Sequence, residues 1–236
     1  MNPIDIRFLK MKFSFESETG EIEDFRFINK YMIDIYGCNM PDDYQVEKPA
    51  EVLIGKAVVY QFLLEYMIRD DYPIYELFSS CGEARDVGDL LLNEEKDDFN
   101  DKYEEFLIDS SNFNVLYLDR VMLYPEYRGY GYGKFIIKDI MGRFYNTVGL
   151  VMTKVFPLQL ELSRKSARME YYSMDQDIEY SSFKLYNYFL NLGFEQENQS
   201  DFFYIQTFFS NEKLSKIDLD SIFHQEYYDK LARRNE

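Results

Sequence analysis

Three of the chain's 11 glycines fall within five residues, in the run Arg128-Gly129-Tyr130-Gly131-Tyr132-Gly133-Lys134. Glycine lacks a Cβ, so its backbone can adopt positive φ angles and approach a ligand closely. Successive backbone N–H groups in such a bend bind anions, and the N-terminus of a following helix adds partial positive charge. Lys134 and Lys138 add full charges. The run therefore predicts a phosphate-binding loop.

The spacing of these glycines does not match either common nucleotide-binding motif. A Walker A loop needs Gly-x4-Gly-Lys-Ser/Thr, but here its first position would be Arg128 and its last Phe135. A Rossmann loop needs Gly-x-Gly-x-x-Gly, but its third glycine would fall at Lys134 or Ile136. A nucleotide binder of either kind is therefore disfavoured, and the phosphate should belong to another class of ligand.

Residue counts exclude several other kinds of site. The 236 residues include one histidine, His224, so a Ser-His-Asp triad or a multi-histidine metal centre is nearly excluded. The two cysteines, Cys38 and Cys81, cannot form a structural zinc site alone and do not suggest a disulfide framework. We expect both thiols to be reduced and buried, as in the cytoplasm, and we expect no metal cofactor.

The charge balance is strongly acidic. Lys and Arg number 26 against 43 Asp and Glu, which gives a net charge of −17. Because neutralising phosphates requires clustered Lys and Arg, we expect no nucleic-acid partner. The most apolar stretch, 52–68, contains Lys56 and Glu65 and is too short between these charges to cross a bilayer. The N-terminus lacks the basic and apolar regions of a signal peptide. These features predict a cytoplasmic protein without a membrane partner.

The elements around the glycine run can be read from the spacing of apolar residues. Strict alternation predicts a strand over 8–15, and β-branched and aromatic residues predict another over 51–64, with Gly55 as a bulge. The spacing of Phe25, Ile28, Met32 and Ile35 predicts a helix. The remaining expected elements are strands over 115–123, 150–156 and 202–209 and helices over 133–146, 181–192 and 220–233.

The order of these elements predicts one mixed α/β domain over residues 1–210, followed by a polar, helical tail over 211–236. The apolar run 150–156 is typical of a central strand that is covered on both faces. Residues 70–112 are expected to form an acidic helical insert, since 11 acids and 3 bases lie between Glu83 and Asp109. The insert is either a solvated surface or a wall that attracts a cationic substrate.

The segment Leu118–Gly133 resembles the strand-to-loop motif of the GNAT superfamily of acetyl-CoA-dependent N-acetyltransferases. The family pattern Arg/Gln-x-x-Gly-x-Gly/Ala matches Arg128, Gly131 and Gly133. A second family signature is a helix that ends in Leu-Gly-Phe before a strand, and Leu192-Gly193-Phe194 is similar to it. The resemblance covers residues 8–209 and implies a mixed, mostly antiparallel sheet whose strands over 115–123 and 150–156 splay apart. The segment Phe156-Pro157-Leu158-Gln159 is similar to a bacterial branch of the superfamily.

The resemblance implies acetyl-CoA as acyl donor, with its diphosphate on the amides of the glycine run and its pantetheine arm along the main chain of the preceding strand. The implied cofactor-binding residues are Met122, Leu123, Arg128, Gly129, Tyr130, Gly131, Tyr132, Gly133 and Lys134.

Two catalytic residues are expected by the same resemblance. Asp119 stands where many family members have Glu, so it is the candidate general base, and the alternative is a structural carboxylate in an ion pair. The family tyrosine that protonates the leaving thiolate falls at Phe189, which has no hydroxyl. Tyr186, one helical turn earlier, is therefore the candidate acid, with Tyr188 or no acid at all as alternatives. Ser182 takes the place of a frequent family Asn.

Together these features predict direct transfer of an acetyl group from acetyl-CoA to a primary amine of a small molecule or protein. The acidic insert favours a cationic acceptor. The alternative is a weak or inactive GNAT-like module that binds acyl-CoA or a partner, since Phe189 replaces the family tyrosine. The length of the acyl group and the formation of a homodimer remain open.

Overall fold

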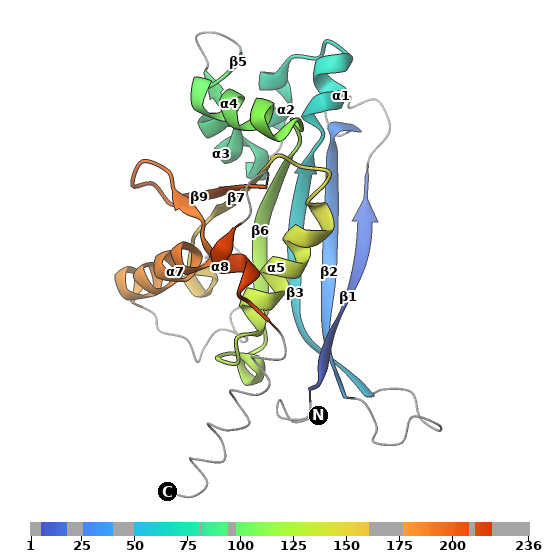
Figure 1. Cartoon of the computed structure of the whole chain (residues 1–236), viewed down its shortest axis with the longest axis vertical. Helices are drawn as coiled ribbons and strands as arrows, with labels where there is room; N and C mark the ends of the chain where they lie inside the picture. The colour runs from blue at the N-terminus through green and yellow to red at the C-terminus, as the bar shows by residue number, and fades with distance from the viewer. Residues whose placement is uncertain are drawn as a thin grey trace, which may run out of the picture.

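A seven-stranded sheet organises the computed structural model, which describes residues 6–17, 26–39, 50–80, 82–93, 98–160, 177–207 and 211–218 (Figure 1). One pair of neighbouring strands, β6 and β7, is parallel, and the other neighbours are antiparallel. In spatial order the strands are β1 (Phe8–Glu16), β2 (Ile28–Asn39), β3 (Ala50–Phe62), β6 (Val115–Leu123), β7 (Leu150–Lys154), β9 (Phe202–Gln206) and β8 (Glu195–Gln196).

Helices flank this sheet, so the predicted fold class of a mixed, mostly antiparallel sheet with flanking helices is confirmed. A two-stranded sheet joins β4 (Leu92–Asn93) and β5 (Asp98–Phe99). The helices are α1 (Leu64–Arg69), α2 (Ile74–Ser80), α3 (Gly82–Leu91), α4 (Asp101–Ser110), α5 (Tyr132–Phe144), α7 (Ile178–Leu192) and α8 (Glu212–Ser215), with short 3-10 turns at Pro125–Tyr127 and Leu158–Leu160.

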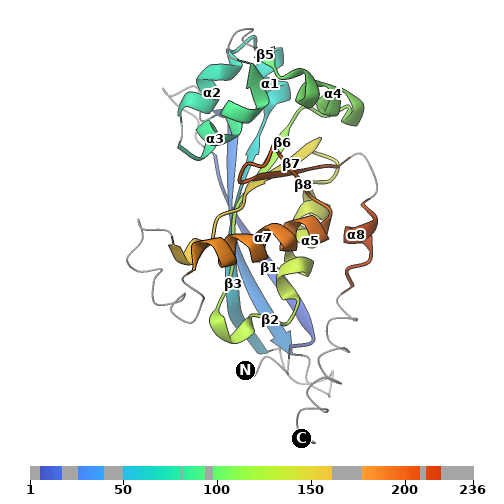
Figure 2. The same cartoon turned by 90° about the vertical axis from the view of Figure 1, so that its left-hand side faces the viewer.

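The central strands are buried on both faces because a separate core packs on each. On β6, Leu116 and Leu118 point into the core formed with α5, while Val115 and Tyr117 point into a second core with α1 to α4. Successive residues of a strand project to opposite faces, which explains this division. Figure 1 shows α5 across the front of the sheet, and Figure 2 shows α7 crossing in front of the strands; both helices pack against the first core. The prediction of a central strand covered on both faces is confirmed for β7.

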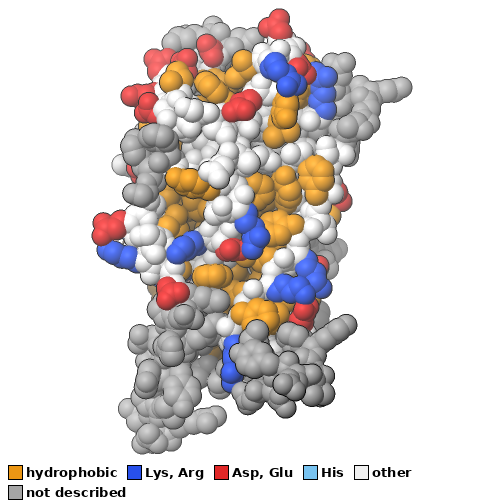
Figure 3. All heavy atoms as spheres, turned by 45° about the vertical axis from the view of Figure 1, so that its right-hand side comes forward, with side chains coloured by type: hydrophobic (Ala, Val, Ile, Leu, Met, Phe, Trp, Pro, Cys, Tyr) orange, Lys and Arg blue, Asp and Glu red, His pale blue; other side chains and the backbone are white. Residues whose placement is uncertain are grey.

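Helices α2 to α4 and the small β4–β5 sheet lie within residues 70–112, the segment that we expected to be an acidic insert, and α1 lies immediately before it. They gather at one end of the molecule, above the sheet in Figure 1. Figure 3 shows acidic side chains concentrated at this end. Apolar residues of the insert, including Leu77, Leu91 and Leu107, are fully buried against the second core. The insert therefore covers the sheet face that α5 and α7 leave open.

One predicted element is wrong. Residues 28–39 form strand β2 and not a helix. The two β-branched residues Ile33 and Ile35 are buried and alternate with the more exposed Met32 and Asp34. β2 pairs with β1 on one side and with β3 on the other, and this pairing overrides the helix-like spacing of the apolar residues.

A bulge was expected at Gly55, and the structure has one at the neighbouring residue, Ile54. The register of β2 against β3 shifts between Ile35 and Tyr36, which pair with Gly55 and Leu53 and leave Ile54 as the extra residue. A Cβ on Gly55 would lie 2.2 Å from the carbonyl oxygen of Met122 on β6. Glycine therefore allows β6 to approach β3 closely at this point.

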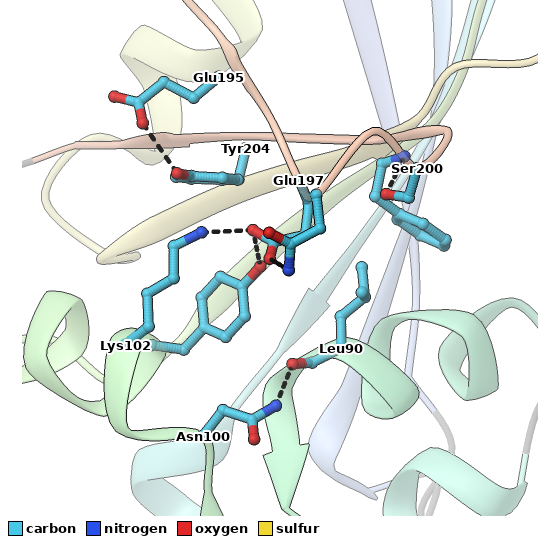
Figure 4. A network of polar contacts seen from close by, with 10 residues as sticks. Leu90, Asn100, Lys102, Glu195, Glu197, Ser200 and Tyr204 are labelled. Carbon is cyan, nitrogen blue, oxygen red and sulfur yellow. Dashed lines mark hydrogen bonds and ion pairs between the residues drawn. The ribbon is translucent and has the colours of Figure 1, made fainter.

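A buried polar network joins the insert to the hairpin of β8 and β9 (Figure 4). Glu197, whose side chain is 6% exposed, accepts hydrogen bonds from the Nζ of Lys102 and, at 2.7 Å, from the hydroxyl of Tyr103. The hydroxyl of Tyr204 donates to Glu195 at 2.8 Å, and its ring lies 4.4 Å from the Nζ of Lys102. Burial, together with Glu197, raises the pKa of Tyr103.

Some of the expected features lie outside the described residues. These are Cys81, His224, the helix over 220–233 and most of the tail over 211–236. Cys38 is buried as a free thiol.

The network predicts that Tyr103→Phe destabilises the protein. At pH 7 the change removes a hydrogen bond to a charged group and should cost about 1.5–3 kcal/mol of unfolding free energy in urea titrations. Tyr75→Phe is the control, because the Tyr75 side chain is 50% exposed and its hydroxyl should contribute little.

Because the pKa of Tyr103 is raised in the folded protein, the destabilisation caused by Tyr103→Phe should depend on pH. The contribution of Tyr103 is present below its unfolded pKa, near 10, and falls as pH rises through the folded value. The stability difference between wild type and Tyr103→Phe should therefore shrink above pH 10. A difference that stays constant with pH, or that is absent at pH 7, would contradict this role.

Candidate functional site

The site is created where β6 and β7 stop pairing. Their parallel register covers only Val115–Tyr117 against Leu150–Met152. One further link follows, in which the Oγ1 of Thr153 donates to the carbonyl oxygen of Leu118 at 2.9 Å. Beyond this link a cleft of about 850 Å³ opens between the strands. The predicted splay of these two strands is confirmed.

Within the described residues, four parts of the chain line the cleft: strand β6, the glycine run with the first turns of α5, the end of β7 with the residues that follow it, and α7. Most lining side chains are apolar, with a small number of charged groups among them. This composition is typical of a small-molecule or cofactor site.

The glycine run forms the bend that the sequence predicts. Gly129 and Gly131 both have φ of 78°, and Gly131 is the N-cap of α5. A Cβ built on Gly129 would meet nothing within 4 Å, so open space lies beside the loop. The Nε of Arg128 donates to the carbonyl oxygen of Leu123 at 2.7 Å and so braces the loop against the end of β6. The backbone N–H groups at the start of α5 are thus presented to the cleft.

Eight of the nine expected cofactor-binding residues line the cleft, and Tyr130 does not. The ring of Tyr130 stacks on that of Tyr132, with their centroids 5.8 Å apart. Tyr132 is fully buried and anchors the start of α5. The eight lining residues are Met122, Leu123, Arg128, Gly129, Gly131, Tyr132, Gly133 and Lys134.

Asp119 occupies a β-bulge. Against β3, Val58 pairs with Arg120 and Val59 pairs with Leu118, so Asp119 is the extra residue of β6. A bulge turns two successive side chains toward the same face, which an unbroken strand would not do. The Nε of Arg120 donates to Asp119 at 2.7 Å, and their side chains are 19% and 12% exposed. Of the two roles considered for Asp119, the ion pair is therefore present, and one carboxylate oxygen is engaged in it.

The structure places Tyr186 away from the cleft, so its expected position as the leaving-group acid requires correction. Its hydroxyl donates to Asp201, its ring packs on Phe203, and burial with Asp201 raises its pKa to about 12. Successive residues of a helix are turned by about 100°. Tyr188 lies near the middle of the cleft-lining stripe of α7 and Phe189 lies at its edge, so the position one turn before Phe189 falls beyond that edge.

Tyr188 reaches the glycine run instead. A Cβ built on Gly133 would lie 2.8 Å from the hydroxyl oxygen of Tyr188. Burial raises the pKa of Tyr188, so its phenol stays protonated throughout the neutral range. The cleft therefore holds a neutral hydroxyl donor beside the N-terminus of α5.

Several lining residues were missed by the sequence analysis. Thr153 and Lys154 are the polar residues of the apolar run 150–156, and their presence in a central strand was the available signal. Lys184 and Ser181 of α7 also line the cleft, and Ser182 does not. No sequence signal distinguished Ser181 from Ser182, because the rotation of α7 against the sheet decides which of them faces the cleft.

The acidic insert does not form a wall of the cleft within the described part of the chain. Its helices cover the sheet near the start of β6, whereas the cleft opens toward the end of that strand. The argument from the insert to a cationic acceptor therefore loses its geometric basis.

Two kinds of feature are absent from the described ranges. No group of three or more His, Cys, Asp and Glu side chains there is arranged to hold a metal ion. No helix there has the length and apolar character needed to cross a membrane.

No protein-family model and no curated protein matches the sequence. Similar solved structures include a KacTA–DNA complex, with a TM-score of 0.37 and 11% identity over 94% of this chain and 99% of that chain. AtaTR bound with acetyl-CoA has a TM-score of 0.36 and 9% identity over 84% and 93% of the two chains. AtaT complexed with acetyl-methionyl-tRNAfMet has a TM-score of 0.36 and 10% identity over 85% and 95%. Such low TM-scores do not establish a shared function or shared site residues.

The expectation of no nucleic-acid partner is contradicted by these similar structures. One of them is a complex with DNA and another is a complex with an acetylated tRNA. That expectation was drawn from net charge alone, and net charge does not report how basic side chains are distributed over a fold. We therefore do not maintain it.

The contact between Tyr188 and Gly133 gives a stability prediction. Gly133→Ala should cost about 1–3 kcal/mol, because the new Cβ lies too close to the Tyr188 hydroxyl and one of the two must move. In a Tyr188→Phe background the same change should cost less than half as much, since the opposing oxygen is gone. Urea unfolding of the four proteins of this double-mutant cycle measures the coupling, and additive costs would show that the two groups do not touch.

Proposed function

We propose that the chain is an N-acetyltransferase that uses acetyl-CoA and acts on a primary amine. The single observation that carries this proposal is the shape of the cleft. It lies between two splayed strands and ends on a positive-φ glycine bend at the start of a helix. The resemblance of Leu118–Gly133 to the GNAT motif supports the same conclusion.

The lining residues fit the donor. The amides of Gly129 to Gly133 would hold the diphosphate, helped by the start of α5 and by the charge of Lys134. The edge of β6 beyond Leu118 faces the cleft where pairing with β7 has stopped, so its main chain would accompany the pantetheine arm. The acetyl group would then lie near the bulge at Asp119.

The donor supplies an activated thioester, and the chain's residues position the proton transfers. The amine nitrogen bonds to the thioester carbonyl carbon, and the carbon–sulfur bond breaks. Asp119, directly or through water, takes the proton that the amine loses. A main-chain N–H at the splay stabilises the oxyanion, and Tyr188 gives its proton to the leaving thiolate. Tyr188 takes the role first considered for Tyr186, because its hydroxyl is on the cleft side of α7.

Acetyl-CoA should stabilise the protein. At about 100 times Kd, linkage adds about 2.7 kcal/mol, which corresponds to a rise in Tm of about 5–10 °C for a domain of this size. ATP and NAD at equal concentration should give no comparable rise. Differential scanning fluorimetry provides the measurement.

Two variants test how much the glycine bend contributes to the binding of acetyl-CoA. Gly131→Ala places a side chain at a φ of 78° beside the expected diphosphate, and Lys134→Met removes one exposed charge. Each ligand-induced shift is read against the variant's own Tm, so a loss of stability is not mistaken for a loss of binding. The shift should disappear in Gly131→Ala and fall by about half in Lys134→Met. Unchanged shifts in both would refute the assigned donor site.

Turnover should depend on Tyr188 and not on Tyr186. Asp119→Asn and Tyr188→Phe should each lower kcat by about 100-fold, a usual contribution of a general base or acid. Tyr186→Phe is the matched control on the same helix and should keep kcat within about twofold. The assay is thiol release from acetyl-CoA with an amine panel. Donor binding without thiol release from any amine would indicate a binding module instead of an enzyme.

A further inference from the structure

The charged residues of the described cleft lining are mostly basic, whereas the whole chain is acidic. The whole chain has a net charge of −17, but among the described residues that line the cleft five side chains are basic and one is acidic. They are Arg120, Arg128, Lys134, Lys154, Lys184 and Asp119. A ligand in this cleft therefore meets local positive charge, and within about 8–10 Å of a binding site nearby charges outweigh distant ones.

These charges divide between the two faces of the sheet. The glycine bend leads into α5, which packs on the first core, and α7 packs against the same core. Arg128, Lys134 and Lys184 therefore belong to the face of α5 and α7. That face is the one on which the proposed donor diphosphate lies, so these three cations lie on the donor side of the cleft.

Strand alternation places Lys154 on the opposite face. Val151 and Val155 belong to the first core, whereas Leu150 and Met152 belong to the second. Because side chains alternate along a strand, Lys154 is on the same face as Leu150 and Met152. Its Nζ lies 5.2 Å from the ring centroid of Phe202, a residue of the second core.

The bulge places Asp119 and Arg120 on that opposite face too. Before the bulge, Val115 and Tyr117 point into the second core, and Asp119 continues their alternation. After it, Val121 and Leu123 pack against the first core, so Arg120 points away from them. The cleft thus has a second set of charged groups on the face away from the glycine bend.

This second set offers an anion and two cations together. Asp119 is an acceptor for an ammonium group, while Arg120 and Lys154 are donors for an acid group. The Arg120 side chain is only 19% exposed, and a cation that is partly removed from water is strongly stabilised by an anionic ligand.

We infer that the acceptor amine belongs to a molecule with a carboxylate or phosphate a few bonds from the nitrogen, and that Lys154 with Arg120 recognises this acid group. The inference rests on the proposed acetyl transfer and specifies its substrate class. The acid group holds the acceptor on the face opposite the donor diphosphate, and the amine then lies beside Asp119 at the splay. A polyamine or another purely cationic acceptor carries no anionic group that could bind these two side chains.

The test compares acceptors that differ only in their acid group. The pairs are phenylalanine against phenethylamine and O-phosphoethanolamine against ethanolamine, with 1,5-diaminopentane as the purely cationic acceptor. At saturating acetyl-CoA, kcat/KM should be at least 10-fold higher for the acid-bearing member of one pair or of both. The pair with the larger ratio identifies carboxylate or phosphate as the preferred group. The inference would be overturned if kcat/KM were the same for the two members of each pair, or if the diamine were the preferred acceptor.

Lys154→Met tests the recognition directly. It should lower kcat/KM for the acid-bearing acceptor about 10-fold. The kcat/KM of the matched acceptor that lacks the acid group should stay unchanged. Lys56→Met is the matched control, because Lys56 pairs with Met122 on β6, is 53% exposed and does not line the cleft. It removes the same charge and should change neither value. An equal fall for both acceptors in Lys154→Met would show a general role and not recognition of the acid group.

A second readout separates this inference from the proposed function. The thermal shift with acetyl-CoA should be the same in wild type and Lys154→Met, because Lys154 lies on the other face from the glycine bend. A protein that shows no shift with acetyl-CoA and no thiol release would refute the proposed acetyl transfer itself. A normal shift, with no preference for acid-bearing acceptors in turnover or in calorimetric binding to the CoA-saturated protein, would refute only the substrate class.

Discussion

The loss of hydrogen bonding between β6 and β7 is the constraint on which the proposed site depends. Two parallel strands that continued to pair would fill the sheet and leave no opening. Here pairing covers three residues of each strand, and the Thr153 hydroxyl makes the last link to Leu118. The main chain of β6 beyond that point faces the cleft while its other edge stays bound to β3. The sheet thus supplies both a rigid support and an open edge.

The bulge at Asp119 places two charged side chains on the same face of the sheet at this opening. Without the extra residue, Asp119 and Arg120 would project to opposite faces of β6. With it, both lie on the face away from α5, and the apolar residues that follow, Val121 and Leu123, still reach the first core. One irregular residue therefore separates the face that would bind the donor phosphates from the face that would bind the acceptor.

The insert contributes support and not a binding wall. Its helices bury one face of β6, β7 and β9, and the contacts of Lys102 and Tyr103 with Glu197 hold α4 to the hairpin of β8 and β9. That hairpin also holds the cleft elements, since Asp201 accepts bonds from the main-chain N–H of Val155 and from the Tyr186 hydroxyl. The expected catalytic tyrosine therefore has a bracing position between α7 and this turn.

The sequence alone determined the features that depend on local chemistry. The glycine bend, the helix after it and the strand before it follow from residues that are close together in the chain, where φ preference and apolar spacing decide the outcome. The order of the elements predicted a mixed α/β domain, whereas the mostly antiparallel sheet and the splay followed only through the resemblance to a known family. Tertiary structure decided the rest. β2 is a strand because it has two strand partners. Tyr188, and not Tyr186, lines the cleft because packing sets the rotation of α7. Arg120 lies on the same face of the sheet as Lys154 because a bulge shifts the alternation of β6. These outcomes require contacts between distant segments, which no local pattern specifies.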